Sequence, residues 1–190
     1  MGQAKTLTER ELKRVLDYIA LHRHAARNRA MVMLTYYAGL RVSEVAALMY
    51  ADVVAADATV RHEFLLTAEQ TKGGHARMVF VGEKLRKELG AYIKTLKRHE
   101  QEQLPLFRTQ KRDGFSANTL CQHFHWLYQR AGLEGASSHS GRRTFITNLA
   151  AKGVGVRVLA SLAGHRSIAT TQAYIDVNDD MKRKAVELMF

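Results

Sequence analysis

The amino-acid sequence predicts a mainly α-helical fold with a small antiparallel β-sheet (α+β). Hydrophobic residues make up 46% of the 190 residues and there is one proline, a composition typical of an ordered helical chain. Apolar residues recur at helical spacing along most of the sequence, whereas residues 52–81 favour extended segments. No internal repeat, low-complexity tract or linker divides the sequence. We therefore expect a single domain over residues 1–190, with its core at about 8–175 and a tail helix at about 179–190.

Three helices are predicted before residue 50. Thr8 and Glu11 form a capping box that opens the first helix, whose apolar positions are Leu12, Val15, Leu16 and Ile19. The second helix covers about residues 27–38, and its broad apolar surface indicates that it is buried. Gly39 is expected to follow the C-cap of this helix, and Ser43 to cap a third, short helix.

The sheet is predicted between residues 52 and 81. The expected extended segments are 52–54, about 59–66, and 69–72 paired with 76–81, with turns at 56–57 and 73–74 between them. Lys72 would then stand directly before the Gly-Gly tip of a hairpin.

The second half of the sequence is predicted to return to helices. One covers about residues 83–99, and another is capped by Ser116 and ends at Gly132. Ser138 is the predicted N-cap of the next helix. Gly164 is expected to end a further helix, and Ser167 to cap a last one over residues 168–175.

The charge balance predicts a polyanionic partner. Basic residues outnumber acidic ones 29 to 18, which gives a net charge of +11 and favours nucleic acid first and an anionic membrane second. The third interpretation of the charge is a soluble protein that is basic without binding a polyanion. No apolar run approaches the length of a membrane span and there is no signal peptide, so the membrane reading is excluded. The single cysteine, Cys121, excludes an internal disulfide and fits a reducing cytosol.

Two regions carry concentrated positive charge. Residues 84–112 hold nine basic residues against three acidic ones, and residues 182–184 read Lys-Arg-Lys. Each cluster is either a solvated helix surface or a contact to the DNA backbone, which contributes salt-dependent affinity without sequence information.

The residues with the clearest chemistry lie near the C-terminus. His139 and Arg142 are three apart, so on a helix both side chains lie on one face and can bind a single anion. His165 and Tyr174 would lie on opposite faces of one continuous helix, but the break at Gly164 lets His165 fold back toward the phenol. A phosphate held by arginine and histidine beside a tyrosine indicates nucleophilic phosphoryl transfer without a metal or a nucleotide cofactor.

Other chemistries find less support. Cys121, His123 and His125 alternate, so on a helix only the first and last share a face, and no further paired spacing completes a zinc site. No nucleophile elbow for Ser-His-Asp hydrolysis and no phosphate-binding P-loop is present. We expect no metal and no cofactor.

Two upstream residues complete an ordered set. The set reads Arg41, Lys72, His139, Arg142, His165 and Tyr174. This resembles the tyrosine recombinase (phage integrase) family, which carries an arginine, a hairpin lysine, His-x-x-Arg, Gly-His and a tyrosine nine residues later. The resemblance extends from about Thr8 to Tyr174 and implies the fold of the family's catalytic domain.

The resemblance also implies a role for each residue. Tyr174 would attack a DNA phosphodiester and form a 3′-phosphotyrosine, releasing a 5′-hydroxyl, without ATP. Arg41 and Arg142 would hold the non-bridging oxygens, and Glu44 would orient the guanidinium of Arg41. Lys72 would be the general acid or a phosphate contact. His139 would assist proton removal from the tyrosine, and His165 would donate a hydrogen bond to the phosphate.

The sequence departs from the family pattern His-x-Leu-Arg-His at two positions. Gly141 replaces the leucine, which we expect to cost about 1 kcal/mol relative to alanine in a helix and to loosen the backbone of Arg142. Arg143 replaces the second histidine and is a possible further phosphate contact.

The activity implied is site-specific DNA recombination, such as integration, excision or inversion. The protein would be bacterial or phage-encoded, and it would act in the cytoplasm in association with the nucleoid. The alternatives are a nicking-closing enzyme like a type IB topoisomerase, and a DNA-binding module whose catalysis has decayed. Family members commonly carry an N-terminal DNA-clamping domain, which residues 1–190 lack, so an excised domain or a naturally short recombinase is expected. The partners implied are double-stranded DNA and three further copies of the chain. The tail would join this DNA-dependent homo-tetramer through an apolar face of Met181, Ala185, Leu188 and Met189; the alternative is that this face packs on the core of its own chain.

Overall fold

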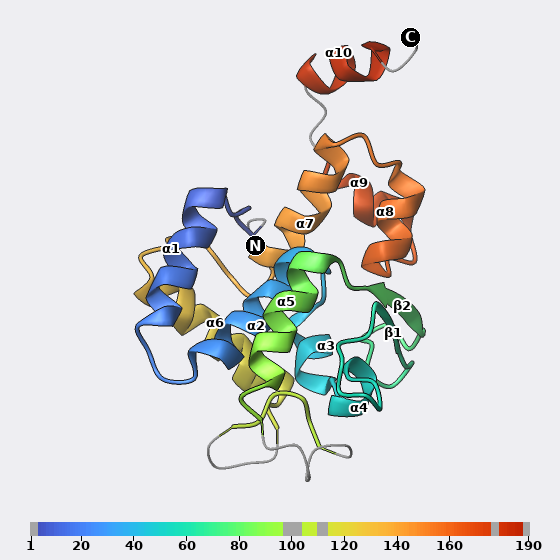
Figure 1. The fold of residues 1–190 in the computed structure, drawn as a ribbon. Coiled ribbons are helices and arrows are strands. Elements are labelled where there is room, and N and C mark those ends of the chain that lie inside the picture. The colour runs from blue at the N-terminus through green and yellow to red at the C-terminus, as the bar shows by residue number, and fades with distance from the viewer. Residues whose placement is uncertain (1–3, 97–103, 110–113, 176–178, 188–190) are drawn as a thin grey trace.

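A computed structural model of the protein describes residues 4–96, 104–109, 114–175 and 179–187. The described chain is rich in helices and carries one two-stranded antiparallel sheet (Figure 1), as the sequence predicts. No described helix is both long and apolar enough to cross a membrane.

Helix α2 (Ala25–Tyr37) lies at the centre of the fold. Helices α1 (Glu9–Ala20), α3 (Val42–Ala47), α5 (Glu83–Ile93) and α7 (Ser140–Ala151) all pack against it. Every residue of α2 from Ala30 to Tyr36 is buried, which confirms the prediction of a buried helix. The hydrophobic core therefore surrounds α2 on several sides and fixes α7, the helix that carries Arg142, in place.

The ends of several helices follow the predicted capping signals. The Thr8 side chain accepts from the Glu11 backbone and Glu11 accepts from the Thr8 backbone, which confirms the capping box of α1. Ser116 caps α6 (Ala117–Arg130), which packs against α1 and α3. Gly39 follows the C-cap of α2 as predicted. Helix α5 ends at Ile93, whereas the prediction extended to residue 99; residues 97–99 lie outside the described residues.

The sheet differs from the prediction in its pairing. Strand β1 (Glu63–Leu66) pairs antiparallel with β2 (Arg77–Phe80), with Glu63 opposite Phe80. Residues 69–72 were predicted to form the partner strand, but they lie in the turns of the connection between the strands. The reason is that the Gln70 side chain bonds Oδ2 of Asp52 at 2.6 Å and the Ala47 carbonyl at 3.1 Å, which holds the connection against α4.

The segment 52–54 was also predicted to be extended, and this is wrong for most of it. Asp52 lies in the short helix α4 (Tyr50–Val53), because its carboxylate accepts the backbone N–H of Met49 at 2.8 Å and caps the helix. Only Val54 makes a β-bridge, to Val60, across the predicted turn at 56–57.

The C-terminal helices α7, α8 (Val156–Ala163) and α9 (Ile168–Gln172) form a group beside β2 (Figure 1). Gly164 ends α8 with a φ of +64°, and Ser167 occupies the N-cap of α9, both as predicted. Helix α9 ends at Gln172 rather than residue 175, so Tyr174 follows the helix. Helix α10 (Asp179–Glu187) stands apart from the other helices in Figure 1.

Two predicted N-caps are wrong. Helix α7 has His139 at its N-cap rather than Ser138, because the hydroxyl of Ser138 is buried and bonded by the Cys121 thiol at 3.0 Å. Helix α3 has Arg41 at its N-cap rather than Ser43, because the Glu44 carboxylate accepts the Arg41 backbone N–H at 2.8 Å.

Candidate active site

The fold buries one carboxylate between two guanidinium groups. Glu44 is 0% exposed; its Oε1 accepts from Arg41 Nη1 at 2.8 Å, and its Oε2 accepts from Arg77 Nη2 at 2.7 Å. Burial alone raises the pKa of Glu44, but Arg77 and the backbone and charge of Arg41 outweigh burial and hold that pKa below its ordinary value. Glu44 is therefore an ionised carboxylate that fixes two cations.

Arg142 is a buried cation held by carbonyl groups. Its side chain donates from Nη1 to the Gly39 carbonyl and from Nη2 to the Ala163 carbonyl, both at 2.6 Å, and the residue is 3% exposed. Burial, and then the positive charge of Arg41, lower the pKa of Arg142 to about 9, so the guanidinium stays protonated at neutral pH. A buried guanidinium bonded to neutral groups favours the approach of an anion.

His165 is held in one protonation state by its two hydrogen bonds. Arg142 Nη2 lies 2.9 Å from Nε2, and because a guanidinium only donates, Nε2 accepts. The Nδ1 atom lies 2.8 Å from the Thr171 hydroxyl and carries the proton. Burial, followed by the charges of Arg142, Arg41 and Arg77, lowers the pKa of His165 to about 4. The ring is therefore neutral at pH 7.

Tyr174 lies against this histidine, as the predicted break at Gly164 requires. The two rings stack with centroids 5.7 Å apart and an interplanar angle of 19°. The guanidinium of Arg143 lies 5.6 Å from the centre of the Tyr174 ring, and the Thr147 hydroxyl donates to the Tyr174 carbonyl at 3.3 Å. Helix α7 thus points Arg142 into the buried cluster and places Arg143 and Thr147 against the tyrosine.

His139 and Lys72 lie at the edge of the cluster. Partial loss of water lowers the pKa of His139, and the positive charges of Arg142, Arg41 and Lys72 lower it further. Lys72 is exposed on the connection between β1 and β2, at a place where its charge acts on the imidazole. The structure therefore brings all six residues of the ordered set to one region, with Lys72 and His139 exposed.

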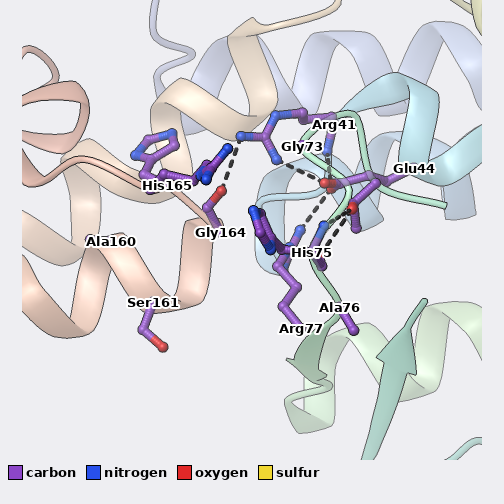
Figure 2. Close-up of a pocket in the computed structure, with 12 residues that line it drawn as sticks. Arg41, Glu44, Gly73, His75, Ala76, Arg77, Ala160, Ser161, Gly164 and His165 are labelled. Carbon is purple, nitrogen blue, oxygen red and sulfur yellow. Dashed lines mark hydrogen bonds and ion pairs between the residues drawn. The ribbon is translucent and has the colours of Figure 1, made fainter. Parts of the chain in front are cut away.

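The cluster opens into a cavity of about 240 Å³ (Figure 2). Arg41, His165 and Arg77 line it, together with Thr71, Gly73 and His75 from the β1–β2 connection. Figure 2 shows Arg41 reaching both Glu44 and the carbonyl of Gly164, the latter at 3.3 Å. The cavity thus lies between the strand connection on one side and the end of α8 on the other.

Gly141 has a packing role that the sequence did not indicate. A Cβ at this position would collide with Oγ1 of Thr35 on α2 and would lie 2.9 Å from the Thr35 Cβ. The absent side chain lets α7 approach α2 closely, and Arg142 next to it is buried and bonded. The expectation that Gly141 loosens the Arg142 backbone is therefore corrected: close helix packing holds that backbone.

Arg77 is the member of the cluster that sequence reasoning missed. It occurs in the same Lys-Gly-Gly-His-Ala-Arg run as Lys72, and its side chain is 9% exposed. The signal that could have found it is an arginine at the start of a strand whose alternate positions are buried, since such a cation needs a partner.

Among the described residues, no group of three or more His, Cys, Asp and Glu side chains is placed to hold a metal ion. His123 lies 3.2 Å from Oδ1 of Asn28, and Cys121 bonds Ser138.

The fold and the cluster together define a helical domain that concentrates buried cations next to a tyrosine. The chain belongs to the phage integrase family, whose family model matches residues 5–181.

Curated relatives share this match. Tyrosine recombinase XerA of Thermococcus kodakarensis is 33% identical over 183 residues, which are 96% of this chain and 62% of that protein. Tyrosine recombinase XerD of Mycobacterium tuberculosis is 34% identical over 153 residues, or 78% of this chain and 47% of that protein. The chain thus spans less than two thirds of the length of these relatives.

Solved structures agree on the fold. A crystal structure of XerA recombinase superposes with a TM-score of 0.76 at 26% identity, covering 100% of this chain and 66% of that one. The catalytic domain of bacteriophage HP1 integrase gives a TM-score of 0.64 at 22% identity, covering 90% of this chain and 87% of that one. The Tn1549 transposon integrase, solved in complex with circular intermediate DNA, gives a TM-score of 0.74 at 20% identity, covering 100% of this chain and 68% of that one.

Proposed function

We propose that this chain cleaves and rejoins DNA strands at a specific site, as a tyrosine recombinase. The observation that supports this most is the buried, carbonyl-bonded Arg142, with His165 bonded to it and stacked on Tyr174. Among the described residues Arg142 bonds carbonyl groups and no carboxylate, and such a cation next to a phenol suits a phosphodiester better than it suits a structural ion pair. Membership of the phage integrase family and the recombinase relatives support the same function.

In the proposed reaction the Tyr174 oxygen forms a bond to phosphorus and the bond from phosphorus to the 5′ oxygen breaks. Arg41 and Arg142 offset the charge that builds up on the non-bridging oxygens. His139 accepts the phenol proton, for which its lowered pKa keeps it neutral, and Lys72 protonates the departing 5′ oxygen or contacts the phosphate. The product is a 3′-phosphotyrosine, and reversal of the step rejoins the strand without ATP.

His165 needs a change of protonation to play its proposed part. Its Nε2 accepts from Arg142, so it donates to a phosphate after the ring takes up a proton, or after the proton moves from Nδ1 to Nε2 and Nδ1 accepts from the Thr171 hydroxyl. An arriving phosphate raises the pKa of the ring, because an opposite charge favours the protonated form.

The proposed partner is double-stranded DNA. The net charge of +11 supports it, and related integrase folds have been solved on DNA. We also propose that the tail joins copies of the chain into a tetramer on DNA. The described side chains of α10 are exposed, with Val186 at 64%, which suits docking on a neighbour. Leu188 and Met189 lie outside the described residues, as does the side chain of Met181.

The test uses DNA selected by the protein itself. A randomised duplex pool is enriched for binding, and the enriched sequence is then rebuilt with a nick near its centre, so that the cleaved end diffuses away. We expect a denaturation-resistant protein–DNA adduct with this duplex, and recombined product when two intact copies are supplied. Tight binding with neither adduct nor product would overturn the proposal and support a DNA-binding module.

A type IB topoisomerase-like activity uses the same residues. It would relax supercoiled plasmid without any preferred site, whereas a recombinase requires the selected sequence. The reading of decayed catalysis rested on Gly141, and the close packing of Gly141 on Thr35 removes that reason.

A further inference from the structure

Arg77 connects three elements around the candidate site. Arg77 is the first residue of β2; its Nη2 donates to Glu44 on α3 at 2.7 Å, and its Nη1 donates to the Leu162 carbonyl on α8 at 2.9 Å. The side chain also fills the space beneath Gly164. A Cβ at Gly164 would lie 2.5 Å from Cδ and 2.8 Å from Nε of Arg77. The last turn of α8, where the chain continues into His165, is therefore built directly on this guanidinium.

Glu44 transmits the position of Arg77 to Arg41. One carboxylate oxygen accepts hydrogen bonds from both Arg77 Nη2 and the backbone N–H of Arg41, and the other accepts from Arg41 Nη1. Because Glu44 is fully buried, it keeps its charge only while cations compensate it. Without Arg77, Arg41 would be the remaining described cation bonded to Glu44, and its guanidinium would be drawn toward the carboxylate and away from a phosphate.

We propose that Arg77 is a positioning residue that sets the geometry of Arg41 and His165 together, before DNA binds. This rests on the proposed strand-transfer function. Arg77 reaches Arg41 through Glu44, and it reaches His165 through Leu162 and the close contact at Gly164. It lies on the strand that follows Lys72, so it also fixes one end of the connection that carries the proposed general acid. Its role is to hold Arg41 and His165 at the separation that allows both to contact one phosphate.

Two variants of the full chain test this. Arg77→Met keeps the length of the side chain and removes its charge and donors. Arg77→Lys keeps the charge, but one ammonium does not reproduce the planar fork that bonds Glu44 and the Leu162 carbonyl together. Arg86→Met is the matched control, because Arg86 also bonds a carbonyl (Val60, 3.3 Å) and a carboxylate (Glu83, 3.5 Å), but on α5 away from the cavity.

The measurements are the rate of adduct formation at saturating nicked DNA, the dissociation constant for intact DNA at several salt concentrations, and the melting temperature. We expect Arg77→Met to lower the rate by about 100-fold, since misplacing reacting groups by about 1 Å has an effect of this size. Its dissociation constant and the salt dependence of binding should stay close to wild type, and Arg77→Lys should recover part of the rate. Arg86→Met should cleave at the wild-type rate.

A double variant separates positioning from general destabilisation. Arg77→Met with Glu44→Gln should be no slower than the slower single variant, because both residues act through one hydrogen-bonded unit. If the rate losses of the two single variants multiply in the double variant, the proposal is contradicted. Wild-type cleavage rates in both Arg77→Lys and Arg77→Met would also contradict it. A fall in affinity with a smaller salt slope would also overturn it, since Arg77 would then bind phosphate directly. If Arg77→Met does not fold, Arg77→Lys carries the test. Failure of the wild-type chain to form any adduct would count against the proposed function instead.

Discussion

Arg142 Nη2 lies 2.9 Å from Nε2 of His165 and 2.6 Å from the carbonyl oxygen of Ala163. The arginine comes from the first turn of α7 and the histidine from the residue after the C-cap of α8. This contact joins two helix ends through a charged group that is 3% exposed. It makes Arg142 both a structural link and the most buried candidate ligand for a phosphate.

Replacing Arg142 should therefore affect stability and cleavage together. Arg142→Ala leaves the Gly39 and Ala163 carbonyls without this donor, at a cost of about 1–3 kcal/mol for each unsatisfied group. We expect a lower melting temperature and a loss of cleavage of about 100-fold or more, with DNA binding largely retained because many backbone contacts supply it. Arg10→Ala, on the exposed surface of α1, is the control. Undiminished cleavage by Arg142→Ala would point to Arg143 as the phosphate ligand.

Gly141→Ala should destabilise the protein although alanine is the better helix former. The new methyl group collides with Thr35, so α7 must move away from α2, and overpacking of this kind costs about 1–3 kcal/mol. Gly90→Ala is a matched control, because Gly90 lies in α5 and its Cβ would meet nothing within 4 Å. That variant should gain about 0.5–1 kcal/mol. Chemical denaturation measures both, and a stabilised Gly141→Ala would contradict the packing account.

Arg143 has two possible roles that salt dependence distinguishes. If it orients the Tyr174 ring, Arg143→Ala should slow cleavage by about two- to fivefold, the effect of a cation–π contact of about 0.5–1 kcal/mol. The slope of log affinity against log salt should then stay unchanged. The loss of one phosphate contact would instead reduce the magnitude of this slope by about 0.9, and that result would show that Arg143 binds the DNA backbone.

The stability of the fold should fall as the pH drops from about 6.5 toward 4. Burial, and then the charges of Arg27 and His24, lower the pKa of His123 from 6.5 to about 4. In this window the unfolded chain binds a proton at His123 that the folded chain excludes, so acid favours unfolding. For one proton, the free energy of unfolding falls by at most about 1.4 kcal/mol for each pH unit. His165 adds to the effect in the same direction.

Denaturation at several pH values between 5 and 7.5 tests this linkage. His123→Gln should flatten the dependence, whereas His125→Gln, at an exposed position of the same helix, should not. An unchanged pH dependence in His123→Gln would mean that other groups cause it.

Local sequence signals predicted much of this architecture. The helices capped by Thr8 and Ser116, and the helix end at Gly164, follow from capping rules that involve residues within a few positions of one another. The ordered set of six residues was recognised because its motifs resemble, in order and spacing, the pattern of the tyrosine recombinase family.

The features that the sequence did not indicate depend on long-range contacts. Gly141 packs against Thr35, more than a hundred residues earlier, and Arg77 pairs with Glu44 on another element. The strand register was missed because Gln70 bonds Asp52 and replaces the expected ladder. No periodicity in the sequence reports such contacts, because each depends on how separate helices and strands come together.

The most direct test of the account is to find the residue that carries the DNA. The adduct formed on the nicked, selected duplex is digested with nuclease and protease, and the peptides are analysed by mass spectrometry. We predict a nucleotide attached through phosphate to Tyr174, and no adduct from Tyr174→Phe, with Tyr37→Phe as a matched control that still forms it. An adduct on any other residue, or one that persists in Tyr174→Phe, would contradict the claim that this phenol is the nucleophile.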